Sequence, residues 1–367
     1  MTVTMDSKIR ERYSRQILFA EIGESGQERL RASSAVLVGC GALGTATANL
    51  LVRAGLGKLR IVDRDFVEAS NLQRQTLFEE ADARANLPKA VASERRLTAI
   101  NSDVKTEGVI ADVTPANVHE LLGAFPLLLD GTDNFETRLL INDYAVSRNI
   151  PWVYAAVVAS YGVTMTVCPG ETACLECLSG DAGNELENLE KTGPARESPG
   201  GHENVEAGSE PTCDTAGVLG AAAGVIACMS ATAAIKLLLG KFKSSDQRLV
   251  SYDVWTGQFQ SIRVARREDC RACGRREFRY LEGKAQPHVT MCGRDSVQIH
   301  ERRRRLELIA LGHTLAATGL DVRQNEFLLR FQVPPYEVTV FADGRAIVKG
   351  TRDPAVARSL YARYIGA

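Results

Sequence analysis

The stretch that decides the fold reads Ala35-Val36-Leu37-Val38-Gly39-Cys40-Gly41-Ala42-Leu43-Gly44. Its first four residues form a short apolar run that is typical of a buried strand. In the glycine pattern that follows, Gly39 bends the chain, Gly41 lets the backbone approach a phosphate, and Gly44 packs the next helix on the sheet. The start of that helix offers unpaired N–H groups and the positive end of a dipole to an anion. The stretch therefore predicts a nucleotide site.

A second strand follows this helix and ends in a carboxylate. It reads Leu59-Arg60-Ile61-Val62-Asp63, and a carboxylate at this place can accept hydrogen bonds from the hydroxyl groups of a ribose. Strand, helix and strand together form a βαβ unit, so we expect an α/β fold with a Rossmann-like, doubly wound and mostly parallel sheet. Most chains that carry this fingerprint alone are dinucleotide enzymes, which makes an NAD-dependent dehydrogenase the alternative.

Polar residues after the second strand lie at the carboxyl edge of the predicted sheet. The loop 65–75 mixes amide, hydroxyl and guanidinium groups, which suit contacts with phosphate and ribose. A solvated loop is the alternative for any one of these residues. Lys89 stands in the first turn of a helix that Pro88 opens, where a lysine gains nothing from the helix dipole. Lys89 is thus either solvated or directed at an anion.

A further buried strand, Leu127-Leu128-Leu129-Asp130, runs into Gly131-Thr132-Asp133-Asn134. Asp133 and Asn134 could hold Mg²⁺ or the edge of an adenine, because hard cations prefer oxygen ligands. The alternative is that they cap the helix that begins at Phe135, since Asp and Asn are favoured capping residues. The two interpretations are compatible.

Composition limits the class of protein. The chain has 367 residues, enough for two domains, and its net charge of −1 provides no strong field for nucleic acid or an anionic membrane. Met1 to Arg12 is polar, so we expect no signal peptide. The segment from Gly217 to Ile235 carries no charge and is about long enough to cross a bilayer, but its many Ala and Gly residues favour a buried helix.

Two Cys-x-x-Cys pairs predict a metal site. Nine cysteines are an odd number, which indicates a reducing compartment and therefore a cytoplasmic location. Each pair can offer two thiolates from a tight turn, and two pairs complete a closed, structural Zn²⁺ shell. A single pair would be ambiguous with a redox dithiol. The predicted ligands are Cys174, Cys177, Cys270 and Cys273.

A long polar segment divides the chain between these motifs. Residues 179–211 are rich in Gly, Glu, Pro and Ser, and we interpret them as a mobile loop. The loop leads to Cys213, which stands at the start of the apolar helix, where a thiol can have a lowered pKa and act as a nucleophile. The alternative for Cys213 is a buried, inert thiol.

The sequence changes character beyond Cys273. We predict a first domain over 1–275, a polar linker over 276–285 and a small C-terminal α+β domain over 286–367. In the last of these, Tyr336 to Val340 and Arg345 to Val348 are typical of a β-hairpin. Thr351 to Tyr364, with Pro354 in its first turn, is typical of a capped amphipathic helix.

Taken together, these motifs resemble the ThiF/MoeB family of adenylyltransferases, which are relatives of the ubiquitin-activating enzymes. The matching pieces run in the family's order from about residue 10 to residue 273. They are Arg12 to Gln16, Gly39 to Gly44, Asp63 with Asp65, Ser70 to Arg74, Lys89, Thr132 to Asn134, both Cys-x-x-Cys pairs and Thr212-Cys213.

The resemblance implies a reaction. A ubiquitin-like sulfur-carrier protein that ends in Gly-Gly presents its C-terminal carboxylate to ATP with Mg²⁺, pyrophosphate leaves, and an acyl-adenylate forms. The pathway would be thiamine or molybdenum-cofactor biosynthesis, with a cysteine desulfurase or another sulfur donor as a further partner. The loop 179–211 would correspond to the segment that crosses over the tail of the carrier.

The resemblance also assigns roles to residues. Nucleotide-binding residues would be Gly39, Gly41, Gly44, Asp63, Asp65, Ser70, Asn71, Gln73, Arg74, Lys89, Asp133 and Asn134. Asp133 would help to place Mg²⁺, and Asn71, Arg74 and Lys89 would contact the phosphates. Arg15 would reach the γ-phosphate of the neighbouring subunit's ATP, which implies a homodimer. Cys213 would bond to the carrier or relay sulfur, as in members of the thiamine pathway.

Two further hypotheses compete with adenylation. A dehydrogenase would leave Arg15, Arg74, Lys89 and the paired cysteines without a function. A non-catalytic scaffold of the same fold would not need to keep the phosphate-facing residues, and this chain has all of them.

Overall fold

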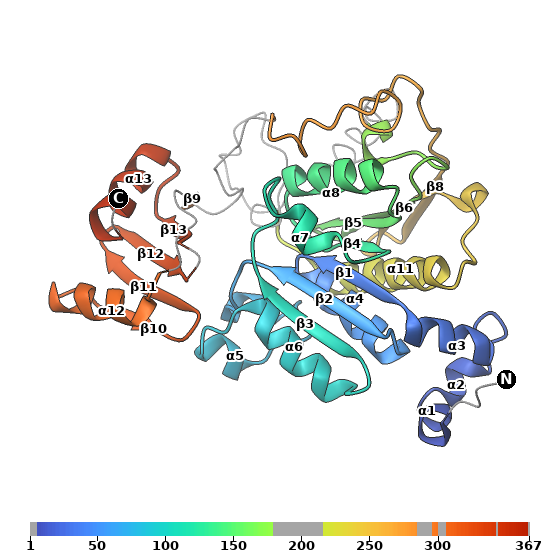
Figure 1. The fold of residues 1–367 in the computed structure, drawn as a ribbon, viewed down its shortest axis with the longest axis horizontal. Helices are drawn as coiled ribbons and strands as arrows, with labels where there is room; N and C mark the ends of the chain where they lie inside the picture. Colours follow the sequence, from blue (N-terminus) through green and yellow to red (C-terminus); the bar gives the residue numbers. More distant parts are fainter. Residues whose placement is uncertain (1–5, 179–215, 285–295, 300–305, 343, 366–367) are drawn as a thin grey trace. The chain divides into compact units, whose positions relative to one another are not determined.

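The computed structural model of the protein describes residues 6–178, 216–284, 296–299, 306–342 and 344–365. The chain divides into two compact units, Met1–Ala285 and Gln286–Ala367 (Figure 1). The predicted loop 179–211 and Cys213 lie outside the described residues.

The first unit is built on an eight-stranded sheet with the order β3-β2-β1-β4-β5-β6-β7-β8. Strands β3, β2, β1, β4 and β5 run parallel, and β6, β7 and β8 each run antiparallel to the preceding strand. This arrangement confirms the predicted Rossmann-like, mostly parallel sheet. The strands are β1 (Ser34–Val38), β2 (Lys58–Asp63), β3 (Lys105–Ile110), β4 (Leu128–Asp130), β5 (Trp152–Val158), β6 (Tyr161–Val167), β7 (Leu249–Asp253) and β8 (Gln258–Ile262).

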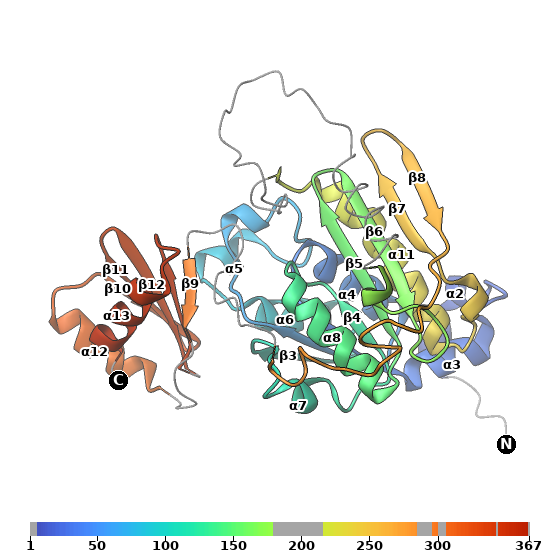
Figure 2. The same cartoon turned by 90° about the horizontal axis from the view of Figure 1, so that it is seen from above.

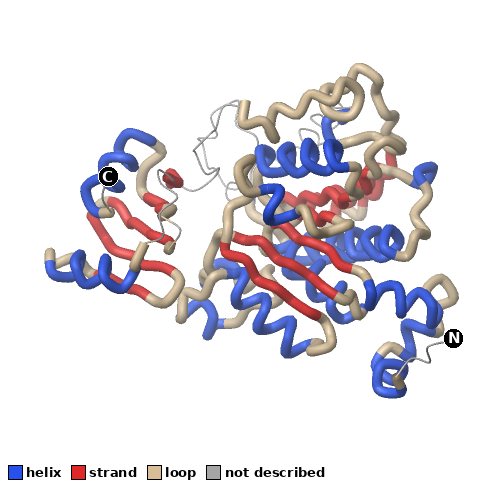
Figure 3. Tube along the Cα trace, viewed as in Figure 1, coloured by secondary structure: helices blue, strands red, loops and turns tan. Residues whose placement is uncertain are grey.

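Helices cover both faces of this sheet, as Figure 3 shows. One face carries α4 (Ala42–Ala54), α6 (Lys89–Ile100) and α11 (Gly220–Leu238), and the other carries α7 (Val118–Leu122) and α8 (Phe135–Arg148). Successive side chains of β1 alternate between the two cores: Ala35 and Leu37 belong to one buried cluster, and Val36 and Val38 belong to the other. A strand that is buried on both faces has no polar position, which is why β1 is apolar over its buried residues, Ala35 to Val38.

Short helices complete the first unit. They are α1 (Ser7–Arg12), α2 (Ser14–Ile17), α3 (Gly23–Ala32), α5 (Glu80–Arg84) and the 3-10 turns η1 (Ala69–Asn71), η2 (Leu175–Leu178) and η3 (Ser244–Asp246).

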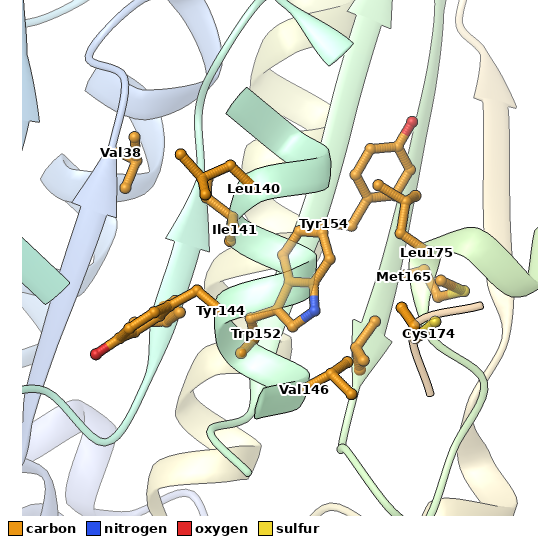
Figure 4. Close-up of a cluster of buried hydrophobic side chains, with 14 of the residues drawn as sticks. Val38, Leu140, Ile141, Tyr144, Val146, Trp152, Tyr154, Met165, Cys174 and Leu175 are labelled. Atoms are coloured by element: carbon orange, nitrogen blue, oxygen red, sulfur yellow. The ribbon is translucent and has the colours of Figure 1, made fainter. Parts of the chain in front are cut away.

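Helix α8 is the centre of one core. Figure 4 shows Leu140, Ile141 and Tyr144 of this helix beside Trp152 of β5. Trp152 is fully buried, and its ring lies edge-on to Tyr154 with 6.2 Å between ring centroids. The same cluster includes Cys174, so this core extends from the sheet to the predicted metal ligands.

Helix α11 has the length and composition of a membrane span but packs into the first unit. It lies against α4, β5 and β6, and its residues Ala223, Ile226 and Ala227 are buried. A Cβ atom on Gly162 of β6 would lie 2.4 Å from the side chain of Ile226, so only glycine permits this approach. The segment is a core helix, as the sequence indicates.

The two edge strands of the sheet, β3 and β8, were not expected from the sequence. Figure 2 shows β7 and β8 as a hairpin at the edge of the sheet. We did not predict β8, and we did not predict β3 at the opposite edge. Four of the five β8 residues are exposed and none of the β3 residues is fully buried, so neither strand carries the apolar run that marks a core strand.

The segment that the sequence predicts as a linker, 276–285, packs against the first unit over its described part. Phe278, Tyr280 and Leu281 contact the core around α8, and Tyr280 N donates to Asp143 Oδ2 at 2.9 Å.

The second unit has a five-stranded antiparallel sheet with the order β10-β11-β12-β13-β9. Its elements are β9 (Ser296–Ile299), α12 (Leu308–Ala317), β10 (Val322–Gln324), β11 (Leu328–Val333), β12 (Tyr336–Phe341), β13 (Ala346–Lys349) and α13 (Pro354–Tyr364). The predicted hairpin is present, with Val340 opposite Ala346, and Asp353 caps α13 at Ala355 N. This unit has the α+β composition that the sequence predicts.

Candidate active site and metal centre

The glycine loop (Gly39–Gly44) follows β1 at the point where the strand order reverses, which is where open α/β sheets bind ligands. Gly39 has φ +86°, and a Cβ atom there would lie 2.5 Å from Gly131 O in the loop after β4. A Cβ atom on Gly44 would lie 2.1 Å from Gly39 O. Gly39 therefore makes the turn, and Gly44 lets α4 pack closely against it.

Gly41 has a different environment from its neighbours. It is the N-cap of α4, with no side chain bonded to the first turn of that helix. A Cβ atom on Gly41 would meet one atom within 4 Å, Gln75 Nε2 at 4.0 Å. There is therefore room beside Gly41 at the start of α4, where the free N–H groups of a helix can bind a phosphate.

Asp63 fastens the glycine loop to the end of β2. Its Oδ2 accepts from Cys40 N at 2.5 Å, and its Oδ1 accepts from Asp65 N at 2.7 Å. Burial raises the pKa of Asp63, and the nearby Lys89 ammonium opposes that rise. Asp63 is 8% exposed, so the carboxylate that is predicted to bind the ribose lies deep in the site.

Lys89 is buried beside the carboxylate of Asp65 and is not a solvated side chain. Its Nζ lies 3.1 Å from Asp65 Oδ2, and its side chain is 5% exposed. Lys89 N also donates to Asp65 O at 2.9 Å, so the start of α6 is fixed to the loop after β2. The solvated alternative is therefore wrong for Lys89, whose ammonium faces the Asp65 carboxylate.

The loop 70–74 places its side chains in different ways. Asn71 is buried, and its Oδ1 accepts from Glu68 N at 3.0 Å, which closes the loop. Arg74 Nη1 donates to Ser70 O at 2.9 Å in an exposed hydrogen bond. Ser70 and Gln73 are exposed. Within the described chain, no residue accepts from Asn71 Nδ2, which leaves that group for a ligand.

Asn134 and Asp133 have separate roles in the fold. Asn134 is the N-cap of α8, and its side chain accepts from Thr137 N at 2.8 Å. The capping interpretation is thus confirmed for Asn134. Asp133 is exposed, and its charge is one of those that raise the pKa of the Arg64 guanidinium. Burial lowers the pKa of Arg64, and Asp112, Asp65 and Asp133 together raise it further than burial lowers it.

A buried ion pair stabilises the loop after β4. No sequence pattern indicated it. Arg138 Nε lies 3.1 Å from Asp130 Oδ2, and Arg138 Nη2 donates to Thr132 O at 2.6 Å. The Asp130 side chain is fully buried. We interpreted Asp130 only as the end of a strand and Arg138 only as part of a helix, because nothing in their spacing marks them as partners.

The four predicted metal ligands come together. Their sulfur atoms all lie within 4.8 Å of one another, and all four residues are buried. Cys174 Sγ is 3.6 Å from Cys270 Sγ, and Cys177 Sγ is 3.3 Å from Cys273 Sγ. A tetrahedral zinc ion with Zn–S bonds of about 2.3 Å would hold its sulfurs about 3.8 Å apart, so the cluster has the right size.

Helix α8 contributes the groups that surround these cysteines. Asn142 Nδ2 lies 3.8 Å from Cys174 Sγ, and Asn142 Oδ1 accepts from Leu175 N at 3.0 Å. Next to it, the fully buried Asp143 side chain pairs with Arg271 Nη2 at 2.9 Å. Arg271 lies between two of the ligands in sequence and also pairs with Glu176. Helix α8 thus joins the metal centre to the loop that its N-terminus follows.

Arg15 is remote from the glycine loop of its own chain. Gln16, the next residue, donates to Ala54 O at 2.8 Å, and Ala54 ends α4. Gly41 stands at the other end of this 13-residue helix, which is about 20 Å long. Arg15, Leu18 and Phe19 are exposed.

The comparisons agree with this arrangement. The ThiF family model matches residues 13–272. The chain belongs to the ThiF family. The match begins just before Arg15 and ends just before Cys273, so it includes the glycine loop, the loops after β2 and β4, and three of the four clustered cysteines.

Relatives of the ThiF family cover different shares of the chain. The sulfur carrier protein ThiS adenylyltransferase of Bacillus subtilis (strain 168) is 43% identical over 359 residues, which is 97% of this chain and 99% of that protein. The molybdopterin-synthase adenylyltransferase of Escherichia coli (strain K12) is 34% identical over 264 residues, which is 72% of this chain and 96% of that protein. By its length, the first match must include most of the second unit.

A solved structure shows the same fold. A crystal structure of Escherichia coli MccB with ATP covers 74% of this chain and 76% of its own chain, with a TM-score of 0.57 and 22% sequence identity.

Proposed function

We propose that this protein uses ATP to adenylate the C-terminal glycine carboxylate of a ubiquitin-like sulfur carrier of the ThiS or MoaD type, with release of pyrophosphate. The observation that carries the proposal is the 43% identity with a ThiS adenylyltransferase over 97% of the chain. The open N-terminus of α4 and the buried cation of Lys89 at the same sheet edge support it. Neither a scaffold nor a dehydrogenase requires that combination.

The reaction needs positive charge more than it needs a base. The carboxylate of the carrier is already ionised at neutral pH, so it can attack the α-phosphate without losing a proton. Negative charge then grows on the phosphate oxygens, where fixed donors and cations lower the barrier. Gly41 and the start of α4 would hold the phosphates, Lys89, Arg74 and Asn71 would contact them, and Asp63 would accept the ribose hydroxyls.

A magnesium ion would neutralise the triphosphate and orient the leaving pyrophosphate. Asp133 is the residue proposed to hold it, because its carboxylate is exposed at the carboxyl end of β4. Asp63 and Asp65 are less suited, since Asp63 is bonded to two backbone N–H groups and Asp65 is paired with Lys89. Carboxylate oxygen is the ligand type that Mg²⁺ prefers.

We propose that the metal bound by Cys174, Cys177, Cys270 and Cys273 is a structural Zn²⁺. Four buried sulfurs leave no open position for a substrate, which is the property of a structural site. The ion would link the end of β6 to the segment after β8. The ion pair between Asp143 and Arg271 would link this metal site to α8.

The same reasoning supports a homodimer. Arg15 is about a helix length from the glycine loop of its own chain, so it can only reach a nucleotide bound by another copy. Leu18 is 74% exposed and Phe19 is 59% exposed, and both lie within four residues of Arg15. A partner subunit that covers these apolar side chains would bring Arg15 to its site.

The pathway and the sulfur chemistry are finer proposals. The Bacillus subtilis ThiS adenylyltransferase has a higher identity and covers more of this chain than the molybdopterin-synthase adenylyltransferase of Escherichia coli, so we favour a ThiS-type carrier and the thiamine pathway. We also propose that a cysteine desulfurase or another donor supplies sulfur, that Cys213 relays it, and that the protein acts in the cytoplasm, where its thiols stay reduced.

Isotope exchange between pyrophosphate and ATP tests the proposed function. The purified protein should catalyse exchange only when a carrier that ends in Gly-Gly is present, because the exchange requires reversible formation of the acyl-adenylate. Mass spectrometry of the carrier should then show an added AMP. A carrier that lacks its last glycine is the control. Binding of NAD without any binding of ATP would overturn the proposal.

A further inference from the structure

We propose that Gln75 is a further nucleotide-binding residue, whose side-chain amide donates to a phosphate oxygen held at Gly41. The inference rests on the proposed function, because it adds a residue to the same site. In this loop, the family resemblance implies nucleotide-binding roles for Gln73 and Arg74 but none for Gln75.

The backbone around Gln75 is fixed to the helix that carries the phosphate-binding turn. Gln75 N donates to Asn71 O at 2.9 Å, and Phe78 N donates to Gln75 O at 3.2 Å. Thr76 N donates to Thr45 Oγ1 of α4 at 3.2 Å. The side chain therefore has a defined place over the first turn of α4.

The amide of Gln75 is buried without a partner. The residue is 3% exposed, and its Oε1 is enclosed by protein atoms with no hydrogen bond. Among the residues that the structure describes, none bonds to its Nε2 either. A buried amide without partners destabilises a fold, and an apolar side chain of similar shape would serve the folded chain equally well. A ligand that accepts from Nε2 would give the amide a partner that the described chain does not provide.

The amide faces the open side of Gly41. Gln75 Nε2 is the one atom that a Cβ atom on Gly41 would meet within 4 Å, at 4.0 Å. The space beside Gly41 is thus bounded by two kinds of donor, the N–H groups that start α4 and the amide nitrogen of Gln75. Two kinds of donor around one opening form a site for an anion.

The chemistry of this amide suits a phosphate. A glutamine amide nitrogen donates two hydrogen bonds, and phosphate oxygens accept them. As a neutral donor it needs no counterion, so it can stay buried before the nucleotide arrives, which a second lysine could not do at low cost. Arg74, the preceding residue, is proposed to contact the same phosphates from the exposed side of the loop.

Calorimetric titration of ATP with Mg²⁺, together with thermal unfolding, tests the assignment without any carrier. We expect Gln75→Met to raise the dissociation constant for ATP about tenfold, because one hydrogen bond to a charged group is lost. Its melting temperature without nucleotide should equal or exceed that of the wild type. Gln75→Glu should weaken binding further, because a carboxylate would face the phosphates.

Gln27 provides a matched control. It is also fully buried, but its Nε2 donates to Ala54 O at 3.0 Å and its Oε1 accepts from Gln16 Nε2 at 2.6 Å. Gln27→Met should therefore lower the melting temperature and leave the affinity for ATP unchanged. A Gln75→Met variant that binds ATP like the wild type, or that only loses stability, would overturn this inference alone. A wild-type protein that does not bind ATP would overturn the proposed function.

Discussion

The two ends of the Asn142 side-chain amide contact Cys174 and the residue that follows it, Leu175. Its Nδ2 lies 3.8 Å from Cys174 Sγ, and its Oδ1 accepts from Leu175 N at 3.0 Å. Asn142 is fully buried on α8. A donor beside a thiolate stabilises the charge of that thiolate, so this contact supports the metal ligand from the protein side.

The first prediction concerns Asn142→Leu. Without the amide, the Cys174 sulfur loses its donor and the turn at Leu175 loses its acceptor. We expect the variant to release zinc to a chelator about 10 to 100 times faster than the wild type. Asn101→Leu is the control, since Asn101 is equally buried but bonds to Tyr13 Oη and Val52 O, away from the cysteines. Equal release rates for wild type and Asn142→Leu would show that the amide has no role in metal retention.

The second prediction separates two glycines of one loop. Gly44→Ala places a Cβ atom 2.1 Å from Gly39 O, so it should lower the free energy of unfolding by about 3 kcal/mol. Gly41→Ala meets only Gln75 Nε2 at 4.0 Å, so it should change stability by about 1 kcal/mol at most and yet fill the space for a phosphate. Urea unfolding and ATP titration measure the two effects. An unstable Gly41→Ala protein would contradict the view that this position is kept for a ligand.

The third prediction concerns Arg74→Ala. The guanidinium makes a single described hydrogen bond, to Ser70 O, so its loss should change the free energy of unfolding by about 0.5 kcal/mol or less. Carrier-dependent exchange should fall by about 10² to 10³, as expected for a donor to developing charge. Arg84→Ala is the matched control, because among the described residues Arg84 pairs with Glu80 alone, in an exposed pair. Normal turnover of Arg74→Ala would remove this residue from the mechanism.

The sequence predicts the parts of this site that depend on local sequence patterns. Gly39 makes the turn and Gly44 makes the close helix contact that their spacing indicates, and the four cysteines meet as their two pairs imply. Gln75 and the Asp130–Arg138 pair could not be found in this way. Their importance depends on burial and on what remains unpaired around them, which are properties of the folded chain. Likewise, β3 and β8 lack a buried face and so lack a periodic signal.

The fourth prediction uses the thiol next to the phosphate-binding turn. Burial, with a further contribution from Asp63, raises the pKa of Cys40 to about 12. At pH 8 about one Cys40 thiol in ten thousand is ionised, against about a quarter for an ordinary thiol. Iodoacetamide should therefore modify the exposed Cys228 in the folded protein and leave Cys40 unmodified, as peptide mapping would show.

The same thiol makes stability depend on pH. The pKa of Cys40 is about 12 in the folded protein and about 8.5 when unfolded, so unfolding releases a proton between these values. The stabilising contribution is complete below pH 8.5 and is lost as pH rises toward 12. Between pH 8 and pH 10 the free energy of unfolding should fall more for the wild type than for Cys40→Ala. Parallel pH profiles for the two proteins would contradict a buried, neutral thiol.

The last prediction tests whether each nucleotide site uses residues from two chains. We propose that Lys89 acts in the site of its own chain, whereas Arg15, about 20 Å away along α4, acts in the site of the partner subunit. Arg15→Ala and Lys89→Ala should each lose carrier-dependent exchange when assayed alone. In a mixed dimer of the two variants, one site lacks both residues and the other site has both. Random mixing in equal amounts, after dissociation and reassociation, should therefore restore about a quarter of the wild-type sites. A mixture that stays inactive although native mass spectrometry shows mixed dimers would place Arg15 and Lys89 in the same chain's site, and an Arg15→Ala protein with full activity would remove Arg15 from the reaction.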